Sequence, residues 1–302
     1  MKRYLVTGGT GFVGGHIARE LISQGYEVLV TGSCPERVPK GSIFLPHNLN
    51  GIDFRMVGGI DGLFHLAANN NTTSDDYEQM IKSNFYAACD LFLAVLHHGN
   101  CEHFVYASST AVYGNQPVPF VENQQLSPLN AYGRSKMRFD NYALEFANRY
   151  NVNMVGLRFC NVYGPGEEHK GPRASMITQL ARKLMDGDRL KLFGDGSELR
   201  EWIYVNDVVK ANLLAMNFEG REIFNCATGI PYTFNEVVSA LHGYFQEKYD
   251  PYFYKPNLDI EFIENPHLDR YQNHVKTDMS KAEKILGFTP DFDIKDGIKD
   301  YL

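Results

Sequence analysis

Apolar residues along the first half of the chain follow two different periods in turn. Short runs rich in β-branched and aromatic residues are separated by longer segments in which apolar side chains recur every three or four positions. Because strands separated by helices need crossover connections, this order predicts an α/β fold built on a doubly wound parallel sheet. The expected strands are 3–7, 27–30, 42–45, 62–66, 103–107 and 153–158, and the expected helices are 12–24, 75–98 and 131–150.

The second half of the chain is less regular. Its pattern predicts helices at 174–185 and 206–216, a strand at 223–226 and a short helix at 280–286 that ends at Gly287. Residues 249–257 combine two prolines with four aromatic residues and show no period, so a loop is expected there. We therefore expect a smaller, interleaved second unit that begins near residue 165.

Composition and charge narrow the class of protein. The 302 residues are 44% hydrophobic and 22% charged, which is typical of a folded globular chain. The formal charge of −7 comes without a basic cluster, which argues against a nucleic-acid partner, and no apolar run approaches the length of a membrane span. The five cysteines form no C-x-x-C pair, so the pattern predicts neither a metal site nor disulfides and favours a reducing cytoplasmic location.

Three glycines with the spacing G-x-x-G-x-x-G lie between the first expected strand and the first expected helix. Gly8 and Gly11 permit a tight turn that approaches a pyrophosphate closely, and Gly14 lets the helix pack against the strand. The helix N-terminus, with Phe12 and Val13, supplies free N–H groups and a partial positive charge. The motif predicts a dinucleotide site, although an ordinary glycine-rich turn has the same letters. No G-K-[ST] follows, so an ATP-hydrolysing loop is not expected.

The end of the second expected strand bears on the choice of dinucleotide. An acidic residue at this point normally holds the adenosine ribose hydroxyls of NAD, but here Gly32 takes its place. Ser33 and Arg37 could instead hold a 2′-phosphate. We therefore expect NADP rather than NAD, with the alternative that Arg37 is a solvated loop charge and NAD binds without the acid.

A tyrosine and a lysine four residues apart open the long helix expected at 131–150. Tyr132 and Lys136 therefore share one helix face, and Ser109 follows the strand whose carboxyl end lies at the ligand edge of such a sheet. A fixed ammonium and a positively charged nicotinamide both favour the phenolate, and lowering a phenol pKa by about three units corresponds to roughly 4 kcal/mol. The three residues together predict a general acid/base site, whereas Y-x-x-x-K alone is common on helices.

These motifs and four further segments resemble one protein family along nearly the whole chain. The chain is similar to the extended short-chain dehydrogenases/reductases of the nucleotide-sugar epimerase/dehydratase family. The resemblance implies a Rossmann domain at 1–165, to which parts of 200–228 return, and a nucleotide-sugar-binding domain at 166–302. It also implies a homo-oligomer, and hydride-transfer chemistry that involves Ser109, Tyr132 and Lys136. The matching segments are 8–14, 64–68, 108–114, 132–136, 158–165, 200–208 and 280–290.

The resemblance and the motifs together give two sets of expected ligand contacts. Asn48 stands where the family often has an aspartate near the adenine, which adds to the doubt that Gly32 casts on NAD. The expected cofactor contacts are Gly8, Gly11, Phe12, Val13, Gly14, Ser33, Arg37, Asn48, Leu49, Leu66, Ala67, Ala68, Asn84, Tyr132 and Lys136. The expected substrate contacts are Ser109, Asn161, Lys170, Arg200, Arg270 and Tyr271.

One segment resembles a single branch of the family. Residues 158–171 are similar to those of ADP-glyceromanno-heptose 6-epimerases, which have a catalytic lysine at the position of Lys170. Tyr132 would then serve one face of the sugar carbon and Lys170 the other, and a five-fold assembly would be expected. The alternative for 167–170 is a solvated charged loop.

Other activities are weighed against this branch. A 4,6-dehydratase is disfavoured because Thr110 and Ala111 stand where that branch has an Asp-Glu pair. A 4-epimerase acting on a UDP- or GDP-sugar and an NADPH-dependent 4-ketoreductase remain open, as does a cofactor-binding protein without turnover.

Overall fold

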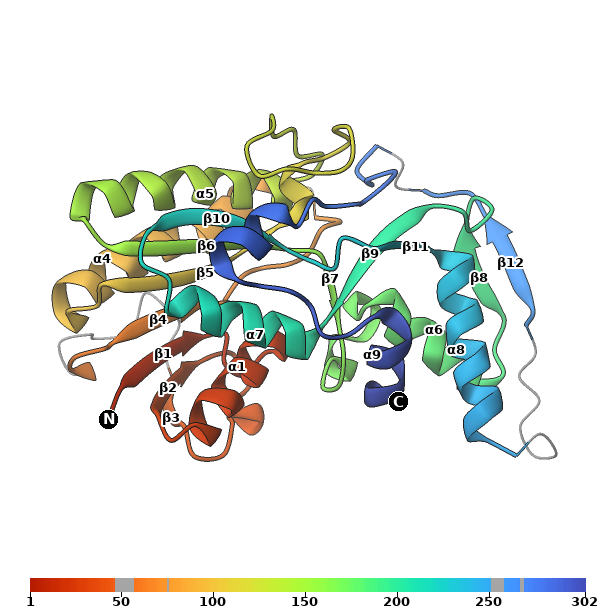
Figure 1. Cartoon of the computed structure of the whole chain (residues 1–302), viewed down its shortest axis with the longest axis horizontal. Coiled ribbons are helices and arrows are strands. Elements are labelled where there is room, and N and C mark those ends of the chain that lie inside the picture. Colours follow the sequence, from red (N-terminus) through yellow and green to blue (C-terminus); the bar gives the residue numbers. More distant parts are fainter. Residues whose placement is uncertain (47–56, 75, 251–257, 267–268) are drawn as a thin grey trace.

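The computed structural model describes residues 1–46, 57–74, 76–250, 258–266 and 269–302 (Figure 1). Seven strands form the central sheet in the order β10-β6-β5-β4-β1-β2-β3, and all paired neighbours run parallel. The order changes direction between β1 and β4, which is where ligands bind in open α/β sheets. The predicted α/β doubly wound sheet is confirmed. Its strands are β1 (Arg3–Thr7), β2 (Glu27–Thr31), β3 (Ile43–Leu45), β4 (Gly62–His65), β5 (His103–Ser109), β6 (Asn153–Phe159) and β10 (Arg221–Cys226).

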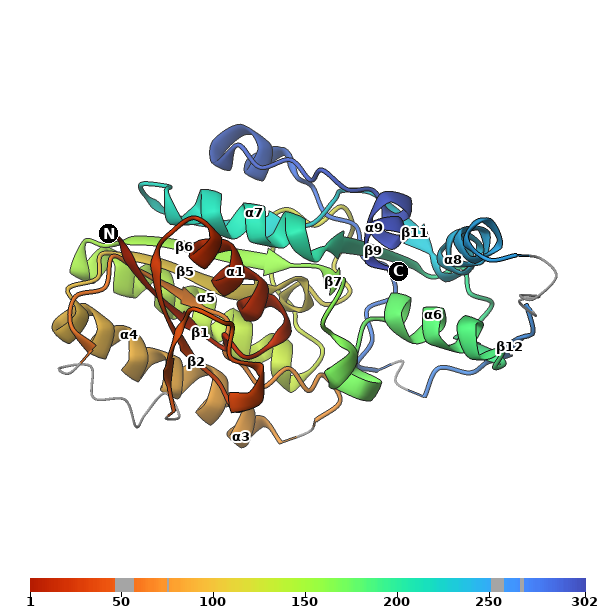
Figure 2. The ribbon, with the colours of Figure 1, turned by 90° about the horizontal axis from the view of Figure 1, so that it is seen from below.

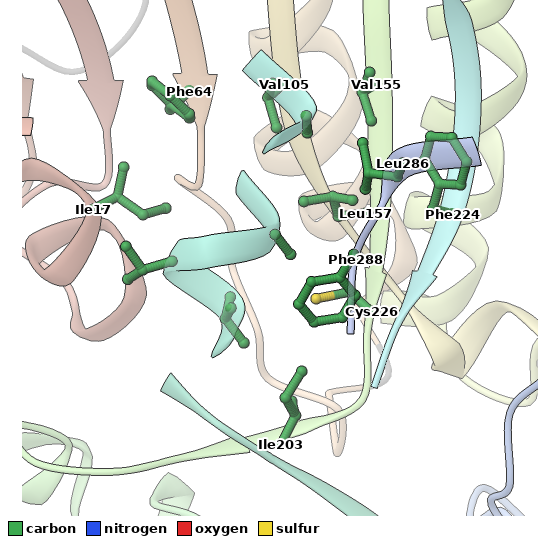
Figure 3. Packing of buried hydrophobic residues seen from close by; sticks show 14 of the residues in the cluster. Ile17, Phe64, Val105, Val155, Leu157, Ile203, Phe224, Cys226, Leu286 and Phe288 are labelled. Carbon is green, nitrogen blue, oxygen red and sulfur yellow. The ribbon is translucent and has the colours of Figure 1, made fainter. Parts of the chain in front are cut away.

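Helices cover both faces of this sheet (Figure 2). Helices α1 (Phe12–Ser23) and α7 (Val205–Met216) pack on one face, and α4 (Ala87–Gly99) and α5 (Ala131–Tyr150) pack on the other. Figure 3 shows the packing on the first face, where Ile17 of α1 lies among residues of β4, β5 and β6. Because helices cover both faces, β1 and β2 are buried at every position after the first.

The helix expected at 75–98 is divided by a wider turn. Helix α3 (Tyr77–Ile81) runs into a π-helical turn, Lys82–Tyr86, before α4 begins. The turn contains Asn84, whose buried side chain bonds both the N–H and the carbonyl of Asn69 and donates to Ser135 Oγ at 3.1 Å. Asn84 therefore braces the segment after β4 against the start of α5.

The rest of the chain builds a smaller region beside the sheet. Strands β7 (Asn161–Tyr163), β9 (Leu199–Tyr204) and β11 (Pro231–Thr233) form one small sheet, and β8 (Leu190–Phe193) and β12 (Ile260–Ile263) form another. Helices α6 (Met176–Asp186), α8 (Phe234–Lys248) and α9 (Ile294–Tyr301) pack around a core that includes Trp202. The chain leaves the central sheet after β6 and returns to it through α7 and β10.

The sequence pattern predicts only part of this region. It places α6 and α7 within two residues, and the turn Ala282–Leu286 ends as expected at Gly287, in the left-handed conformation. It does not predict α8, α9 or the small sheets, because strands of three residues such as β7 and β11 have no readable period. The capping box of Thr233 and Glu236 was a usable signal for α8. Of the loop expected at 249–257, residues 251–257 lie outside the described part.

Two further expectations concern membranes and metals. Among the described residues, no helix combines the length and the apolar character that a bilayer crossing requires. Within the same part of the chain, no three His, Cys, Asp or Glu side chains gather as a metal ion would need.

A buried histidine at the end of β4 makes the fold sensitive to acid. His65 is 3% exposed, and its Nδ1 lies 2.8 Å from Thr7 Oγ1 on the neighbouring strand. Burial, and to a smaller extent the charge of Lys136, lowers the pKa of His65 to about 3. The imidazole therefore stays neutral in the folded protein at pH values where it is protonated in the unfolded chain.

We expect His65→Gln to reduce the loss of stability on acidification. Between about pH 6.5 and pH 3 the unfolded chain binds a proton that the folded protein does not, which lowers the unfolding free energy by about 1.4 kcal/mol per pH unit. From pH 6.5 to pH 5, wild type should lose about 2 kcal/mol more than the variant in urea unfolding. Replacement of the exposed His98 by Gln is the control, and an equal pH slope in wild type and His65→Gln would contradict the assignment.

Candidate functional site

A cavity of about 650 Å³ opens at the carboxyl edge of the central sheet. The cavity is lined by the β1–α1 turn and by the ends of β2, β4 and β5. The start of α5 and the segment that follows β6 form the rest of the lining. The segment after β6 is fixed to α1, because His16 Nε2 lies 2.8 Å from the carbonyl oxygen of Pro165. Both parts of the molecule therefore contribute side chains to one space.

The glycine turn has the geometry of a pyrophosphate cradle. Gly8 has φ +69°, and a Cβ at Gly14 would lie 2.3 Å from the Gly8 carbonyl oxygen, so only glycine permits this approach of helix to turn. In the described part of the chain no side chain caps the first turn of α1, and Gly11, Phe12 and Val13 line the cavity. The N–H groups of a helix start that faces a cavity suit an anion, so these residues fit a dinucleotide.

The end of β2 excludes an acidic side chain at Gly32. A Cβ there would lie 1.9 Å from Thr10 Oγ1 and 2.8 Å from Thr10 Cβ, so rotation of the threonine alone would not make room. Ser33, Cys34 and Arg37 line the cavity beside it. Arg37 Nη2 donates to Cys34 Sγ at 2.6 Å, whereas its buried Nη1 has no hydrogen-bond partner among the described residues. Arg37 therefore retains a donor for an anionic group at this end.

Ser109, Tyr132 and Lys136 meet at the centre of the cavity. The Lys136 ammonium donates to the Ala107 carbonyl oxygen at 2.6 Å and lies 5.9 Å from the centroid of the Tyr132 ring. Burial lowers the pKa of Lys136 to about 8, and the negative charge of Asp140 opposes that shift. The sequence prediction that these three side chains converge agrees with the geometry.

The acidity of Tyr132 differs from the sequence-based expectation. Burial raises the pKa of the phenol above its usual value of 10.0, and a hydrogen bond with Ser109 only partly offsets this. The protein groups alone therefore do not produce an acidic phenol, since Lys136 directs its ammonium to a backbone carbonyl. The positive charge of an oxidised nicotinamide, if bound beside Tyr132, would favour the phenolate.

A buried ion pair lies next to Lys136 on the side away from the cavity opening. Asp140 lies one helical turn beyond Lys136 and accepts from Arg158 Nε at 3.0 Å and from the Tyr106 hydroxyl at 3.1 Å. Arg158 also donates to the Tyr113 hydroxyl at 2.9 Å. Sequence reasoning missed this group, although an acid four residues after the lysine was a readable signal.

The turn Glu168–Arg173 supplies further cationic side chains to the cavity, besides Arg37 and Lys136. Lys170 Nζ lies 3.0 Å from Glu167 Oε2 and 5.0 Å from the centroid of the Phe12 ring. His169 and Arg173, on the same turn, also line the cavity, and sequence reasoning assigned neither of them to the site. The turn thus lines the cavity, although it also faces solvent.

The remaining expected cofactor contacts divide into three groups. Leu66, Ala67 and Ala68 line the cavity, together with Thr10 and Asn70, which sequence reasoning missed. Asn84 does not line it and acts instead as the brace described above. Asn48 and Leu49 lie outside the described residues.

Three of the expected substrate contacts are held by other protein groups. Asn161 donates to the Glu201 carbonyl oxygen at 2.7 Å, although its neighbours Cys160 and Val162 line the cavity. Arg200 is 4% exposed, and its guanidinium lies 4.3 Å from the centroid of the Tyr271 ring. None of Asn161, Arg200 and Tyr271 lines the main cavity: Arg200 is buried, whereas Asn161 is exposed outside it.

The last expected substrate contact, Arg270, lies at a different hollow. It lines a second cavity of about 320 Å³, together with Asn130 and Arg134 near the start of α5. The structure therefore brings Ser109, Tyr132, Lys136 and Lys170 into one cavity. The other four expected substrate contacts, Asn161, Arg200, Arg270 and Tyr271, do not line it.

Comparison with known proteins agrees with this geometry. Residues 4–227 match the family described as "NAD dependent epimerase/dehydratase family". A curated relative, the ADP-L-glycero-D-manno-heptose-6-epimerase of Alkalilimnicola ehrlichii, is 32% identical, with 99% of this chain and 96% of the relative covered.

Two solved structures extend the similarity to three dimensions. The ADP-L-glycero-D-manno-heptose-6-epimerase of Helicobacter pylori has a TM-score of 0.87 at 32% identity, covering 99% of this chain and 94% of its own. The UDP-glucose 4-epimerase of Thermotoga maritima, solved with UDP-glucose, has a TM-score of 0.88 at 26% identity, covering 99% and 97%. On the extent of the family match and the identity to its relatives, the chain belongs to the NAD dependent epimerase/dehydratase family of enzymes.

Proposed function

We propose that this enzyme inverts a carbinol carbon of a nucleotide sugar, and that its substrate is an ADP-heptose inverted at C6. The observation that carries the proposal is the placement of two proton-transfer groups, Tyr132 and Lys170, in one cavity from different parts of the chain. Removal of hydride from the carbinol carbon leaves a planar ketone. Inversion requires that hydride return to the opposite face of this ketone, and the ketone oxygen then lies near a different acid. The similarity to heptose 6-epimerases at 32% identity supports this choice of substrate.

Each residue of the cavity has a separate role in the proposed reaction. A bound dinucleotide supplies the hydride acceptor and donor. Tyr132 takes the proton of the sugar hydroxyl, with Ser109 placed to hold the same oxygen. Lys136, fixed on the Ala107 carbonyl, keeps a positive charge beside the phenol, and Lys170 provides the proton on the second face.

We further propose that the cofactor is NADP, although the family is described as NAD dependent. Gly32 has no room for the acid that would hold a free ribose diol, and Arg37 has an unpartnered buried Nη1 within the described residues. Ser33 adds a hydroxyl donor on the same wall. This set suits a 2′-phosphate better than two hydroxyl groups.

Two other activities use the same residues. A 4-epimerase acting on a UDP-hexose agrees with the similarity to the Thermotoga enzyme, and a 4-ketoreductase needs only Tyr132 and an external hydride supply. NMR spectroscopy of ADP-heptose and UDP-hexose panels separates the three. We expect inversion of the heptose without net consumption of cofactor. Stoichiometric use of NADPH would identify a reductase, and failure of every sugar to react would favour a binding protein without turnover.

We also propose that residues 1–165, with parts of 200–228, work as the cofactor-binding domain and that 166–302 hold the sugar nucleotide. The central sheet supplies the glycine turn and the tyrosine, and the segment after β6 supplies Lys170. A homo-oligomer is proposed from the family resemblance.

Replacement of Tyr132 by Phe should lower kcat by about 10²- to 10⁴-fold, because the proton-transfer group is lost while the ring remains. Epimerisation followed by NMR measures the loss, and thermal unfolding should show an intact fold. Tyr150→Phe, which removes a hydroxyl from the far end of the same helix, is the control and should keep wild-type activity. Normal turnover by Tyr132→Phe would refute the assigned role.

Replacement of Lys170 by Met should lower epimerisation by about 10²-fold or more and leave NADP affinity within about two-fold of wild type. The side chain reaches the cavity from the turn Glu168–Arg173 and contacts the glycine turn through the Phe12 ring, whereas the proposed phosphate contacts are the N–H groups of that turn. Product formation and calorimetry measure the two effects separately. If epimerisation continued unchanged, the one-base alternatives would gain support.

Replacement of Arg37 by Gln should weaken NADP binding by about 10- to 100-fold and leave NAD binding unchanged, because only NADP has the phosphate that the guanidinium would hold. Calorimetry with both dinucleotides gives the ratio. Lys40→Gln, at an exposed cation three residues away, is the matched control. Equal losses for NADP and NAD would mean that Arg37 supports the loop rather than the phosphate.

A further inference from the structure

Glu167 is a fully buried acid beside a charged, solvent-facing turn. Its side chain is 0% exposed, whereas the next two residues, Glu168 and His169, are exposed. A carboxylate in such a position is retained only where donors replace the lost water. The mechanism described above makes no use of it.

Four donors surround the Glu167 carboxylate. Oε1 accepts from Ser175 Oγ at 2.6 Å and from Thr178 Oγ1 at 2.5 Å, and Oε2 accepts from Ser175 N at 2.8 Å. These three donors belong to the first turn of α6, where the helix dipole also favours a negative charge. The fourth donor is Lys170 Nζ, at 3.0 Å from Oε2. Three contacts therefore fix the carboxylate, and the fourth holds the lysine.

The C-terminal helix fixes this arrangement from the other side. The Tyr301 hydroxyl of α9 lies 3.0 Å from Thr178 Oγ1 and donates to Glu168 Oε1 at 3.2 Å. The carboxylate is thus anchored through α6 and α9, neither of which moves with the side chain of Lys170. Across from it, the Lys170 ammonium faces the Phe12 ring of the cofactor-binding turn.

We propose that Glu167 is a positioning residue for Lys170: its carboxylate holds the Lys170 side chain aimed at the cavity, so that Lys170 acts as the acid on the second face. The inference rests on the proposed function. When the flipped ketone is reduced, its oxygen forms a new O–H bond as one Nζ–H bond of Lys170 breaks. Tyr132 has by then taken the proton of the starting hydroxyl. Lys170, whose side chain is 19% exposed, regains a proton from water, and Tyr132 returns its proton to water.

The first test is a double-mutant cycle of Glu167→Gln and Lys170→Met. We expect Glu167→Gln to lower kcat by about 10- to 100-fold with KM and NADP affinity within about two-fold, because a charged partner is lost. In the Lys170→Met background the same substitution should have no further effect on kcat. An equal loss in both backgrounds would show a merely structural role and overturn the inference.

The second test needs neither substrate nor cofactor. Acetic anhydride at pH 8 labels neutral amines, and mass spectrometry reports the rate at each lysine. In Glu167→Gln the Lys170 nitrogen is no longer held by a charge-assisted hydrogen bond to the carboxylate, so Lys170 should be acetylated about ten-fold faster than in wild type. An unchanged rate would overturn the link between the two residues. If Lys170→Met turns over normally, the proposed function fails, while this measurement still decides the link.

Two further variants control for damage to the turn. Ser175→Ala removes one donor to Glu167 and the cap of α6 but leaves the Glu167–Lys170 pair, so it should keep the wild-type acetylation rate and most of kcat. Glu167→Asp keeps the negative charge and shortens the side chain by one methylene, which withdraws the carboxylate from Lys170 and from the α6 donors alike. It should show both effects at a smaller size than Glu167→Gln. Wild-type values in Glu167→Asp and Glu167→Gln alike would overturn the proposal.

Discussion

The close approach of α1 to the turn after β1 is the constraint on which the site depends. Gly14 lies directly over the Gly8 carbonyl, so a side chain at Gly14 would move the helix N-terminus away from the sheet edge, and one at Gly8 would meet the backbone of Ala67. Phe12, at the start of the same helix, faces Lys170, and His16 one turn later holds Pro165. The position of α1 therefore fixes both the anion cradle and the segment that covers it.

Two lysines that line the cavity each lie near a carboxylate. Asp140, which is paired with Arg158, lies one helical turn beyond Lys136. Glu167 contacts Lys170 in a comparable way. Each of the two carboxylates is also held by donors other than that lysine. An orphaned buried charge would cost far more than such a pair.

The sequence predicts the parts of the site that depend on local spacing. The glycine turn and the Tyr132–Lys136 pair are set by distances of three and four residues along one element, and the structure places them as expected. The burial of Asp140 and Glu167 could not be predicted from the sequence, because an acidic residue among other charged residues is usually exposed to solvent. Asn84 and Arg200 differ from expectation because their contacts, with Asn69 and with Tyr271, join residues far apart in sequence. The short strands of the smaller region leave no period to read.

The contact between Thr10 and Gly32 has a consequence for how cofactor choice could change during evolution. An acidic residue at 32 is compatible with this backbone only if residue 10 first becomes smaller, because the two positions share one volume. A single substitution at either site gives either a collision or a void, and neither intermediate gains a new ligand contact. The residue at the end of β2 that bears on dinucleotide preference therefore packs against the glycine turn. A change to an acid at position 32 requires substitutions at both positions 10 and 32.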